Sequence, residues 1–270
     1  MEVRKLDYKV IKNMILALNW KLNPSSFKEA DKLFNQTITY ASKAKNLQVL
    51  ILPPFQYLFN LNNFKLPFNV SLGAQNCFWE NIGSYTGEVS PLYLKENGVD
   101  YALLGHSERR IYLKETPEMI KKKLLTALNA NLKVILCIGE NREIHLKGEK
   151  NIKAFLRFQI NNSLKNFNSL PISLKHNLII AYEPIWAISG FGGKFPENPK
   201  IANDLVLFIK NYLKDKYELN NVLVLYGGSV NSKNITGFLD YEAFNGFLVG
   251  KSSINQQEVE ALIKILKDKK

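Results

Sequence analysis

The chain has 270 residues, of which 46% are hydrophobic and 22% charged, and its formal net charge is +12. These values are ordinary for a globular protein and allow a large core. No apolar run is long enough for a transmembrane helix, and the first twelve residues mix acidic with basic side chains, unlike a signal peptide. Two cysteines, Cys77 and Cys137, give neither a disulfide framework nor metal-ligand spacing. We therefore expect a cytoplasmic protein.

The positive net charge raises the question of nucleic-acid binding. The basic residues are scattered along the chain, however, and the densest run, Lys121-Lys122-Lys123, lies on a helical pattern with a separate apolar face. A solvated helix face explains that run, and the abundance of asparagine beside lysine indicates compositional drift. We expect no nucleic-acid partner and no membrane partner, while a positive field favours an anionic small substrate.

Taken in order, the chain alternates short aliphatic segments with helical patterns. The predicted strands are Met14–Leu18, Val49–Leu52, Val70–Ala74, Tyr101–Leu104, Val134–Ile138, Leu178–Tyr182, Val222–Tyr226 and Gly246–Val249. The clearest predicted helices are Ser26–Ala44, Thr116–Asn131, Glu149–Phe167, Ile201–Tyr217 and Gln256–Lys267. Such alternation indicates an α/β fold with a parallel sheet, and eight units favour a closed (β/α)8 barrel over an open sheet. We expect one barrel domain over residues 13–270, preceded by an N-terminal extension over residues 1–12.

Barrels of this type carry their chemistry on the loops that follow the strands. Seven of the predicted strands are followed by polar or glycine-rich segments: Asn19-Trp20-Lys21-Leu22-Asn23, Gln75-Asn76, Gly105-His106-Ser107-Glu108-Arg109-Arg110, Gly139-Glu140, Glu183, Gly227-Gly228-Ser229 and Gly250-Lys251-Ser252. Each segment alone is more often structural than functional. Their joint position at strand ends predicts a single site.

Glu183 directly follows a predicted strand that Pro184 ends, because proline cannot continue a ladder. An apolar loop jointed by glycines comes next. A carboxylate beside such a loop indicates a base under a lid that excludes water; a capping glutamate before an ordinary turn is the alternative for this motif alone. The predicted lid comprises Pro184, Ile185, Trp186, Ala187, Ile188, Ser189 and Gly190.

The other strand-end residues complement a base. His106 precedes a predicted helix start, where the partial positive charge favours a neutral imidazole that donates a hydrogen bond to a carbonyl. Lys21 supplies a positive charge for the developing oxyanion, and Asn19 supplies a hydrogen bond. Together with Glu183, these groups suit proton transfer next to a carbonyl through an enediolate, and this chemistry requires no metal.

The loops after the last two strands offer backbone N–H groups beside small residues. Ser229 and the segment Gly250-Lys251-Ser252 lie where barrels commonly bind a phosphate. A phosphorylated carbonyl compound of about three carbons would span from these loops to Glu183.

Four segments resemble, in order and over the chain from about residue 13 onward, the triosephosphate isomerase family: 19–23 (NWKLN), 105–109 (GHSER), 181–188 (AYEPIWAI) and 226–231 (YGGSVN). The resemblance implies interconversion of dihydroxyacetone phosphate and glyceraldehyde 3-phosphate in glycolysis and gluconeogenesis, by a homodimer without a cofactor. The family is itself a standard example of a neutral histidine electrophile and of a closing lid.

The resemblance also implies residue roles. Glu183 would be the base and His106 the electrophile, with Lys21 and Asn19 contacting substrate. Phosphate binding would fall to the backbone at Ser189, Ser229, Gly250 and Lys251. Residues 75–90 would form the loop that inserts into the neighbouring subunit, with dimer contacts at Gln75 and Thr86.

The sequence departs from the family pattern at two places. The lid continues Ser189-Gly190-Phe191-Gly192-Gly193-Lys194 where Gly-Thr-Gly-Lys is usual, although the distance to Pro196 is kept. We expect Gly192-Gly193 to loosen the second hinge and to raise KM more than it lowers kcat. Lys251 replaces a usual glycine, so a left-handed backbone there would be strained. We expect its ammonium to point to solvent rather than to the phosphate.

Two other readings stay open at this point. The chain would be another phosphate-binding barrel enzyme of different specificity, or a barrel kept as a binding or scaffold protein. The presence of Glu183, His106 and Lys21 together argues against both. His145 and His176 lie in polar stretches without ligand-spaced partners, so we assign them no role.

Overall fold

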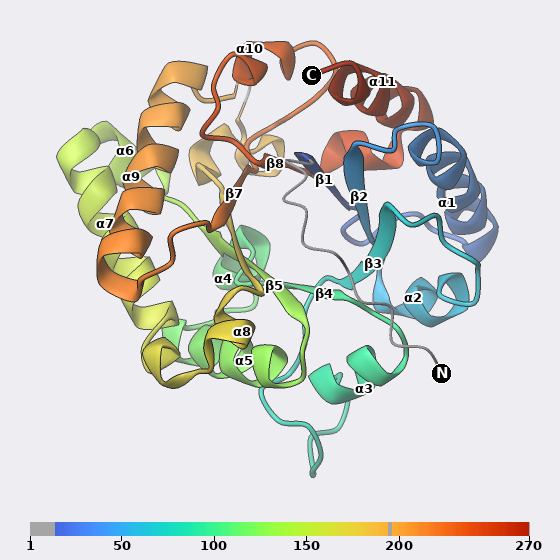
Figure 1. The fold of residues 1–270 in the computed structure, drawn as a ribbon, viewed down its shortest axis with the longest axis horizontal. Helices are drawn as coiled ribbons and strands as arrows, with labels where there is room; N and C mark the ends of the chain where they lie inside the picture. Colours follow the sequence, from blue (N-terminus) through green and yellow to red (C-terminus); the bar gives the residue numbers. More distant parts are fainter. Residues whose placement is uncertain (1–13, 194–195, 270) are drawn as a thin grey trace.

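The computed structural model describes residues 14–193 and 196–269. The extension predicted for residues 1–12, and residues 194 and 195 of the lid region, lie outside this range. Within it, eight parallel strands pair in chain order, and β1 pairs with both β2 and β8, so the sheet is a closed barrel (Figure 1). The strands are β1 (Met14–Asn19), β2 (Leu47–Leu52), β3 (Val70–Ala74), β4 (Tyr101–Leu104), β5 (Lys133–Ile138), β6 (Leu178–Tyr182), β7 (Leu223–Tyr226) and β8 (Gly246–Val249).

Helices form a ring outside the strands (Figure 1). They are α1 (Phe27–Ala41), α2 (Phe55–Leu61), α3 (Pro91–Glu96), α4 (Ser107–Tyr112), α5 (Pro117–Asn129), α6 (Arg142–Leu146), α7 (Glu149–Ser163), α8 (Ile172–Lys175), α9 (Pro199–Tyr217), α10 (Thr236–Leu239) and α11 (Gln256–Lys267). Short 3-10 turns are η1 (Phe167–Ser169), η2 (Ile185–Ala187), η3 (Ser189–Phe191) and η4 (Lys251–Ile254). The predicted α/β fold class, a closed (β/α)8 barrel, is confirmed. Among the described helices, none is long and apolar enough to cross a bilayer.

The strands are apolar on both faces, as a sheet covered by helices requires. Alternate residues of β1 belong to different core layers, with Leu16 and Leu18 packing towards the helices and Ile15 and Ala17 filling the barrel interior. The interior layer is built from every strand except β3: Ile15, Ala17, Leu50, Leu52, Tyr101, Leu103, Ile135, Cys137, Ile179, Ala181, Leu225 and Leu248. The barrel is therefore a packed core rather than a pore, and a ligand must bind at its mouth.

Helix boundaries follow local capping chemistry. The Ser26 side chain accepts a hydrogen bond from the Glu29 N–H at the start of α1, and Thr116 caps α5 with Pro117 in the first turn. The helix predicted over residues 149–167 ends earlier, at Ser163, because the chain leaves the helical region at Leu164 and Asn166 is left-handed with φ of 68°. Asparagine is one of the few residues that adopt this conformation readily.

The loop between β3 and α3 projects away from the barrel (Figure 1). Residues 81–88 are all exposed, although they include Ile82, with 87% of its surface accessible, and Tyr85. The base of the loop is ordered by Phe78, whose ring packs on Trp79 and Tyr85 at centroid distances of 4.1 and 4.8 Å.

Candidate active site

A pocket of about 230 Å³ opens at the ends of the strands. The eight residues predicted for catalysis or substrate binding all line it: Asn19, Lys21, His106, Glu183, Ser189, Ser229, Gly250 and Lys251. They come from the segments after β1, β4, β6, β7 and β8. The barrel thus brings together residues up to 232 positions apart in the sequence, from 19 to 251.

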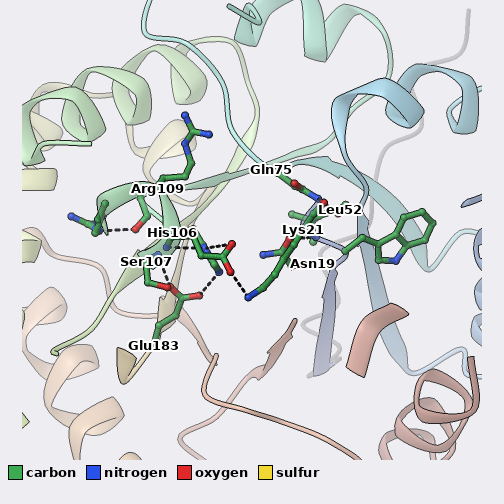
Figure 2. A network of polar contacts seen from close by, with 12 residues as sticks. Asn19, Lys21, Leu52, Gln75, His106, Ser107, Arg109 and Glu183 are labelled. Carbon is green, nitrogen blue, oxygen red and sulfur yellow. Dashed lines mark hydrogen bonds and ion pairs between the residues drawn. The ribbon is translucent and has the colours of Figure 1, made fainter. Parts of the chain in front are cut away.

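Glu183 lies directly beyond β6, and its side chain is 3% exposed. The Glu183 N–H donates to the Ile138 carbonyl at 2.8 Å, which extends the β5–β6 pairing by one residue and fixes the direction of the side chain. One carboxylate oxygen, Oε1, lies 3.2 Å from His106 Nε2, and the other accepts from the Ser107 N–H at 3.3 Å (Figure 2). The carboxylate is therefore held beside the imidazole.

His106 is the N-cap of α4, as the sequence predicts for an imidazole at a helix start. Its Nδ1 accepts a hydrogen bond from the Glu108 backbone N–H at 3.3 Å. An accepting Nδ1 carries no proton, so the neutral ring has its proton on Nε2. That N–H points towards Glu183 and the pocket, where it is available as an uncharged hydrogen-bond donor.

Lys21 has a left-handed backbone with φ of 56°, an uncommon conformation for a side chain of this size. Two neighbours hold it there. The Asn19 Oδ1 accepts from the Lys21 N–H at 3.0 Å, and the Gln75 Nε2 donates to the Lys21 carbonyl at 2.9 Å. The Lys21 ammonium pairs with Glu108 Oε1 at 2.5 Å. Local strain at this position is thus tied to the placement of the positive charge.

The segments after β7 and β8 form the opposite side of the pocket. Ser229 is left-handed with φ of 42°, and its carbonyl accepts from Asn234 Nδ2 at 2.8 Å. The Ser229 hydroxyl is buried without a hydrogen-bond partner among the described residues. Because buried hydroxyls are normally hydrogen-bonded, a polar ligand in the pocket would supply the partner that this one lacks.

The backbone at Lys251 is not strained, whereas a left-handed conformation there would have been. Lys251 begins η4 with a backbone outside the left-handed region, so a side chain is tolerated there, and it is exposed. At Gly250, a β-carbon would lie 2.9 Å from Lys21 Cε, so a larger residue there would displace the Lys21 side chain. The prediction that the Lys251 side chain points to solvent agrees with its exposure.

The predicted lid is a compact segment stabilised by its own backbone. The Ala187 N–H donates to the Pro184 carbonyl, and the Ile188 N–H donates to the Ile185 carbonyl. The Ile188 carbonyl accepts from both the Phe191 and the Gly193 N–H groups. At Gly193, a β-carbon would lie 2.4 Å from the Ala187 carbonyl carbon, so glycine is needed for close backbone approach. We expected Gly193 to loosen the hinge, but the structure shows that glycine is needed there for packing. The expected rise in KM stays a prediction.

Two aromatic side chains connect the lid region to the rest of the chain, one by ring stacking and one by a hydrogen bond. The Phe191 ring stacks on Tyr112 with centroids 5.7 Å apart. The Trp186 indole N–H donates to Glu140 Oε1 at 2.8 Å. Glu140 is fully buried at the end of β5 and also accepts from the Tyr182 hydroxyl at 3.1 Å, and burial raises its pKa to about 7.

Sequence reasoning assigned no role to several of these residues. Glu108 and Glu140 follow strands as Glu183 does, so their position after a strand is the sequence feature that points to them. Asn234, which supports Ser229, lies outside any recognisable pattern. Gln75 was predicted as a dimer contact, and within its own chain it donates to the Lys21 and Leu52 carbonyls. Thr86 lies in the exposed loop of residues 81–88.

Comparison with known proteins agrees with this geometry. The model of the triosephosphate isomerase family matches residues 14–266. The chain is 41% identical to the triosephosphate isomerase of Caldanaerobacter subterraneus subsp. tengcongensis over 254 residues, which cover 92% of this chain and 98% of that protein. It is 39% identical to the enzyme of Wigglesworthia glossinidia brevipalpis (96% and 98% covered) and 34% identical to that of Dictyoglomus thermophilum (94% and 100% covered). The chain therefore belongs to the triosephosphate isomerase family, whose members interconvert dihydroxyacetone phosphate and glyceraldehyde 3-phosphate.

Proposed function

We propose that the chain carries out this isomerisation with Glu183 as base, His106 as electrophile and Lys21 as the fixed positive charge. The Glu183 carboxylate removes a proton from the carbon next to the substrate carbonyl. The His106 Nε2–H donates to the carbonyl oxygen, and the Lys21 ammonium stabilises the negative charge that develops there. A proton also passes from the hydroxyl oxygen to the former carbonyl oxygen through His106 Nε2, and return of the first proton from Glu183 to the neighbouring carbon completes the interconversion.

The observation that carries this proposal is the 3.2 Å separation of Glu183 Oε1 and His106 Nε2 inside the pocket that Lys21 also lines. A base for carbon and a hydrogen-bond donor for oxygen must be adjacent, because the two substrate atoms are bonded to each other. Asn19 would donate a hydrogen bond from its Nδ2, since its Oδ1 is already used by the Lys21 N–H.

Substrate binding replaces contacts seen in this structure. The Lys21 ammonium pairs with Glu108, and the Glu183 carboxylate accepts from the Ser107 N–H. We propose that the substrate oxygen takes the place of Glu108 at Lys21 and that Glu183 leaves Ser107 for the substrate carbon. Interactions made only during reaction raise kcat rather than affinity alone.

We propose that the phosphate binds between the lid and the last two strand-end loops. The donors would be the N–H groups of Ser189, Ser229, Gly250 and Lys251, together with the unpartnered Ser229 hydroxyl. All four residues line the pocket on the side formed by the lid and the β7 and β8 loops. Lid closure would then bring the Ser189 N–H to the phosphate and exclude water.

We further propose that residues 13–270 act as one catalytic domain, in the cytoplasm, and as a homodimer. The β3–α3 loop supports the dimer, because residues 81–88 project into solvent with Ile82 and Tyr85 exposed. Exposed aromatic and aliphatic side chains on a projecting loop are typical of an interface core. Gln75 and Thr86 would contact the partner, with neither a cofactor nor a metal needed for the reaction itself.

A coupled isomerisation assay tests the proposed roles. Wild-type protein should interconvert the two triose phosphates, and larger sugar phosphates should not react. Glu183→Gln should lower kcat by about 10²–10⁴-fold with a small change in KM, because the amide keeps the shape but loses the base. Equal kcat values for the two proteins would contradict the assignment, and activity on larger sugar phosphates would favour a different specificity.

A further inference from the structure

Three residues with metal-ligating side chains meet outside the active-site pocket. Glu140 follows β5, His145 lies on α6, and Glu197 lies just before α9. One ligand atom from each lies within 4.8 Å of the others. His145 Nδ1 is 3.8 Å from Glu140 Oε1 and 3.8 Å from Glu197 Oε2.

Two of these atoms are buried without hydrogen-bond partners among the described residues. They are His145 Nδ1 and Glu197 Oε2, and the Glu197 side chain is only 4% exposed. The other Glu197 oxygen already accepts from the Asn198 N–H at 2.7 Å. A separation of 3.8 Å is too long for a hydrogen bond between them. Two buried polar atoms without partners, one of them on a carboxylate, favour a cation between them when the imidazole Nδ1 is unprotonated.

We propose that Glu140, His145 and Glu197 bind one divalent transition-metal ion, such as Zn²⁺. One imidazole and two carboxylates form a donor set that suits zinc. Neighbouring ligands on a tetrahedral zinc ion lie roughly 3.3–3.5 Å apart, given bonds of about 2.0–2.2 Å. The two 3.8 Å separations from His145 would therefore need to close by about 0.4 Å. The ligand atoms of Glu140 and Glu197, which lie within 4.8 Å of each other, would also need to approach.

Access and charge also fit an ion. The His145 side chain is 28% exposed, which gives a path from solvent, whereas both carboxylates are buried. Within residues 14–193 and 196–269, His145 is the one basic side chain that reaches either carboxylate within 4.0 Å. Glu140 Oε1 also accepts from Trp186, and a carboxylate oxygen has a second lone pair for a metal.

The site contacts the lid at Trp186 and includes a residue from the segment that follows the lid. The His145 ring lies tilted by 33° against the Trp186 ring with centroids 3.9 Å apart, and Glu140 accepts from the same indole. Glu197 lies in the segment that follows the lid, seven positions after Gly190. An ion bound to all three residues would fix the two side chains that contact Trp186 to the segment after the lid, and would thereby slow the motion of the lid. The metal is thus an inhibitor of turnover, and this part of the inference rests on the proposed lid function.

Metal binding is measured first, without substrate, so that it stands independently of the catalytic proposal. Chelator-treated protein is titrated with Zn²⁺ by calorimetry, and wild type should bind one ion per chain. His145→Gln and Glu197→Gln should each weaken that binding by at least about 10-fold. His176→Gln is the matched control, because His176 is exposed and lies outside the cluster of Glu140, His145 and Glu197; it should bind like wild type.

Substitution with Co²⁺ identifies the ligands. Nitrogen and oxygen ligands give no thiolate charge-transfer band, so its appearance would place the metal at Cys77 or Cys137 and overturn the site. With Zn²⁺ present, kcat of the wild type should fall and that of His145→Gln should not. Absence of saturable Zn²⁺ binding, as expected if the three side chains hold only water, would overturn the proposal, and so would equal binding by wild type and His145→Gln. A folded wild type that binds zinc but shows no isomerase activity would instead contradict the proposed function.

Discussion

The lid provides a sharp test at Gly193. In Gly193→Ala, the new β-carbon would lie 2.4 Å from the Ala187 carbonyl carbon, 2.6 Å from its oxygen and 2.8 Å from the Ile188 nitrogen. These atoms belong to the backbone, so no side-chain rotation relieves the clash. The lid must open locally, and the Gly193 N–H bond to the Ile188 carbonyl is lost with it.

The cost follows from two effects. Overpacking costs about 1–3 kcal/mol and a lost hydrogen bond about 1 kcal/mol, and the two overlap because one backbone shift relieves both. We therefore expect the native lid conformation to lose about 1–3 kcal/mol, which corresponds to about a 5–150-fold fall in kcat/KM. Displacement of the Ser189 N–H from the phosphate should make the rise in KM the larger part.

The assay is steady-state isomerisation with glyceraldehyde 3-phosphate, with circular dichroism to confirm the fold. Gly192→Ala is the matched control. Gly192 has a left-handed backbone with φ of 84°, but a β-carbon there would meet no atom within 4 Å, so this variant tests backbone strain without a clash. A kcat/KM for Gly193→Ala within about twofold of wild type, or equal to that of Gly192→Ala, would refute the packing argument.

Three further predictions concern burial and assembly. Glu115→Gln should lower the free energy of unfolding by about 3–5 kcal/mol in urea titrations, because the buried Lys123 loses its charge partner. Glu118→Gln, whose carboxylate pairs with Lys121 but is 57% exposed, should change it by less than about 1 kcal/mol, and equal effects would contradict the role of burial. Burial raises the pKa of Cys77 to about 12 and also raises the pKa of Cys137, so Ellman's reagent should modify neither thiol at about pH 8 until urea unfolds the protein, and rapid labelling of the native state would disprove it. Sedimentation velocity should show a dimer for wild type and a monomer for Ile82→Asp, whereas an unchanged dimer would rule out this loop as the interface core.

Much of the fold was predictable from the sequence because each strand is a nearly continuous apolar run. The predicted strand 70–74 matches β3, and the predicted strand 178–182 matches β6. The predicted strand 49–52 begins two residues late, because Leu47 and Gln48 precede a more obvious aliphatic pattern. The helix predicted to residue 167 was too long, since apolar periodicity continues through a turn that Asn166 makes in a left-handed conformation.

The candidate site was predictable where a residue type and a strand end coincide. Glu183, His106 and Lys21 satisfy that rule, and the barrel brings their loops to one pocket. Two hydrogen bonds follow no such rule, because each depends on how one loop packs on another. Gln75 donates to the Lys21 carbonyl, and Asn234 donates to the Ser229 carbonyl. Glu140 and Glu197 are 57 positions apart, and the cluster that they form with His145 has no recognisable spacing, so only the folded chain reveals it.

The proposed function depends above all on Glu183 moving a proton between two neighbouring carbons while exchanging it with solvent. This step is followed most directly by NMR with the reaction run in D₂O. Wild-type protein should place deuterium on the substrate carbon next to the carbonyl, and Glu183→Gln should do so at least about 100-fold more slowly. Products that form without solvent deuterium, or equal incorporation by the two proteins, would contradict this role of Glu183.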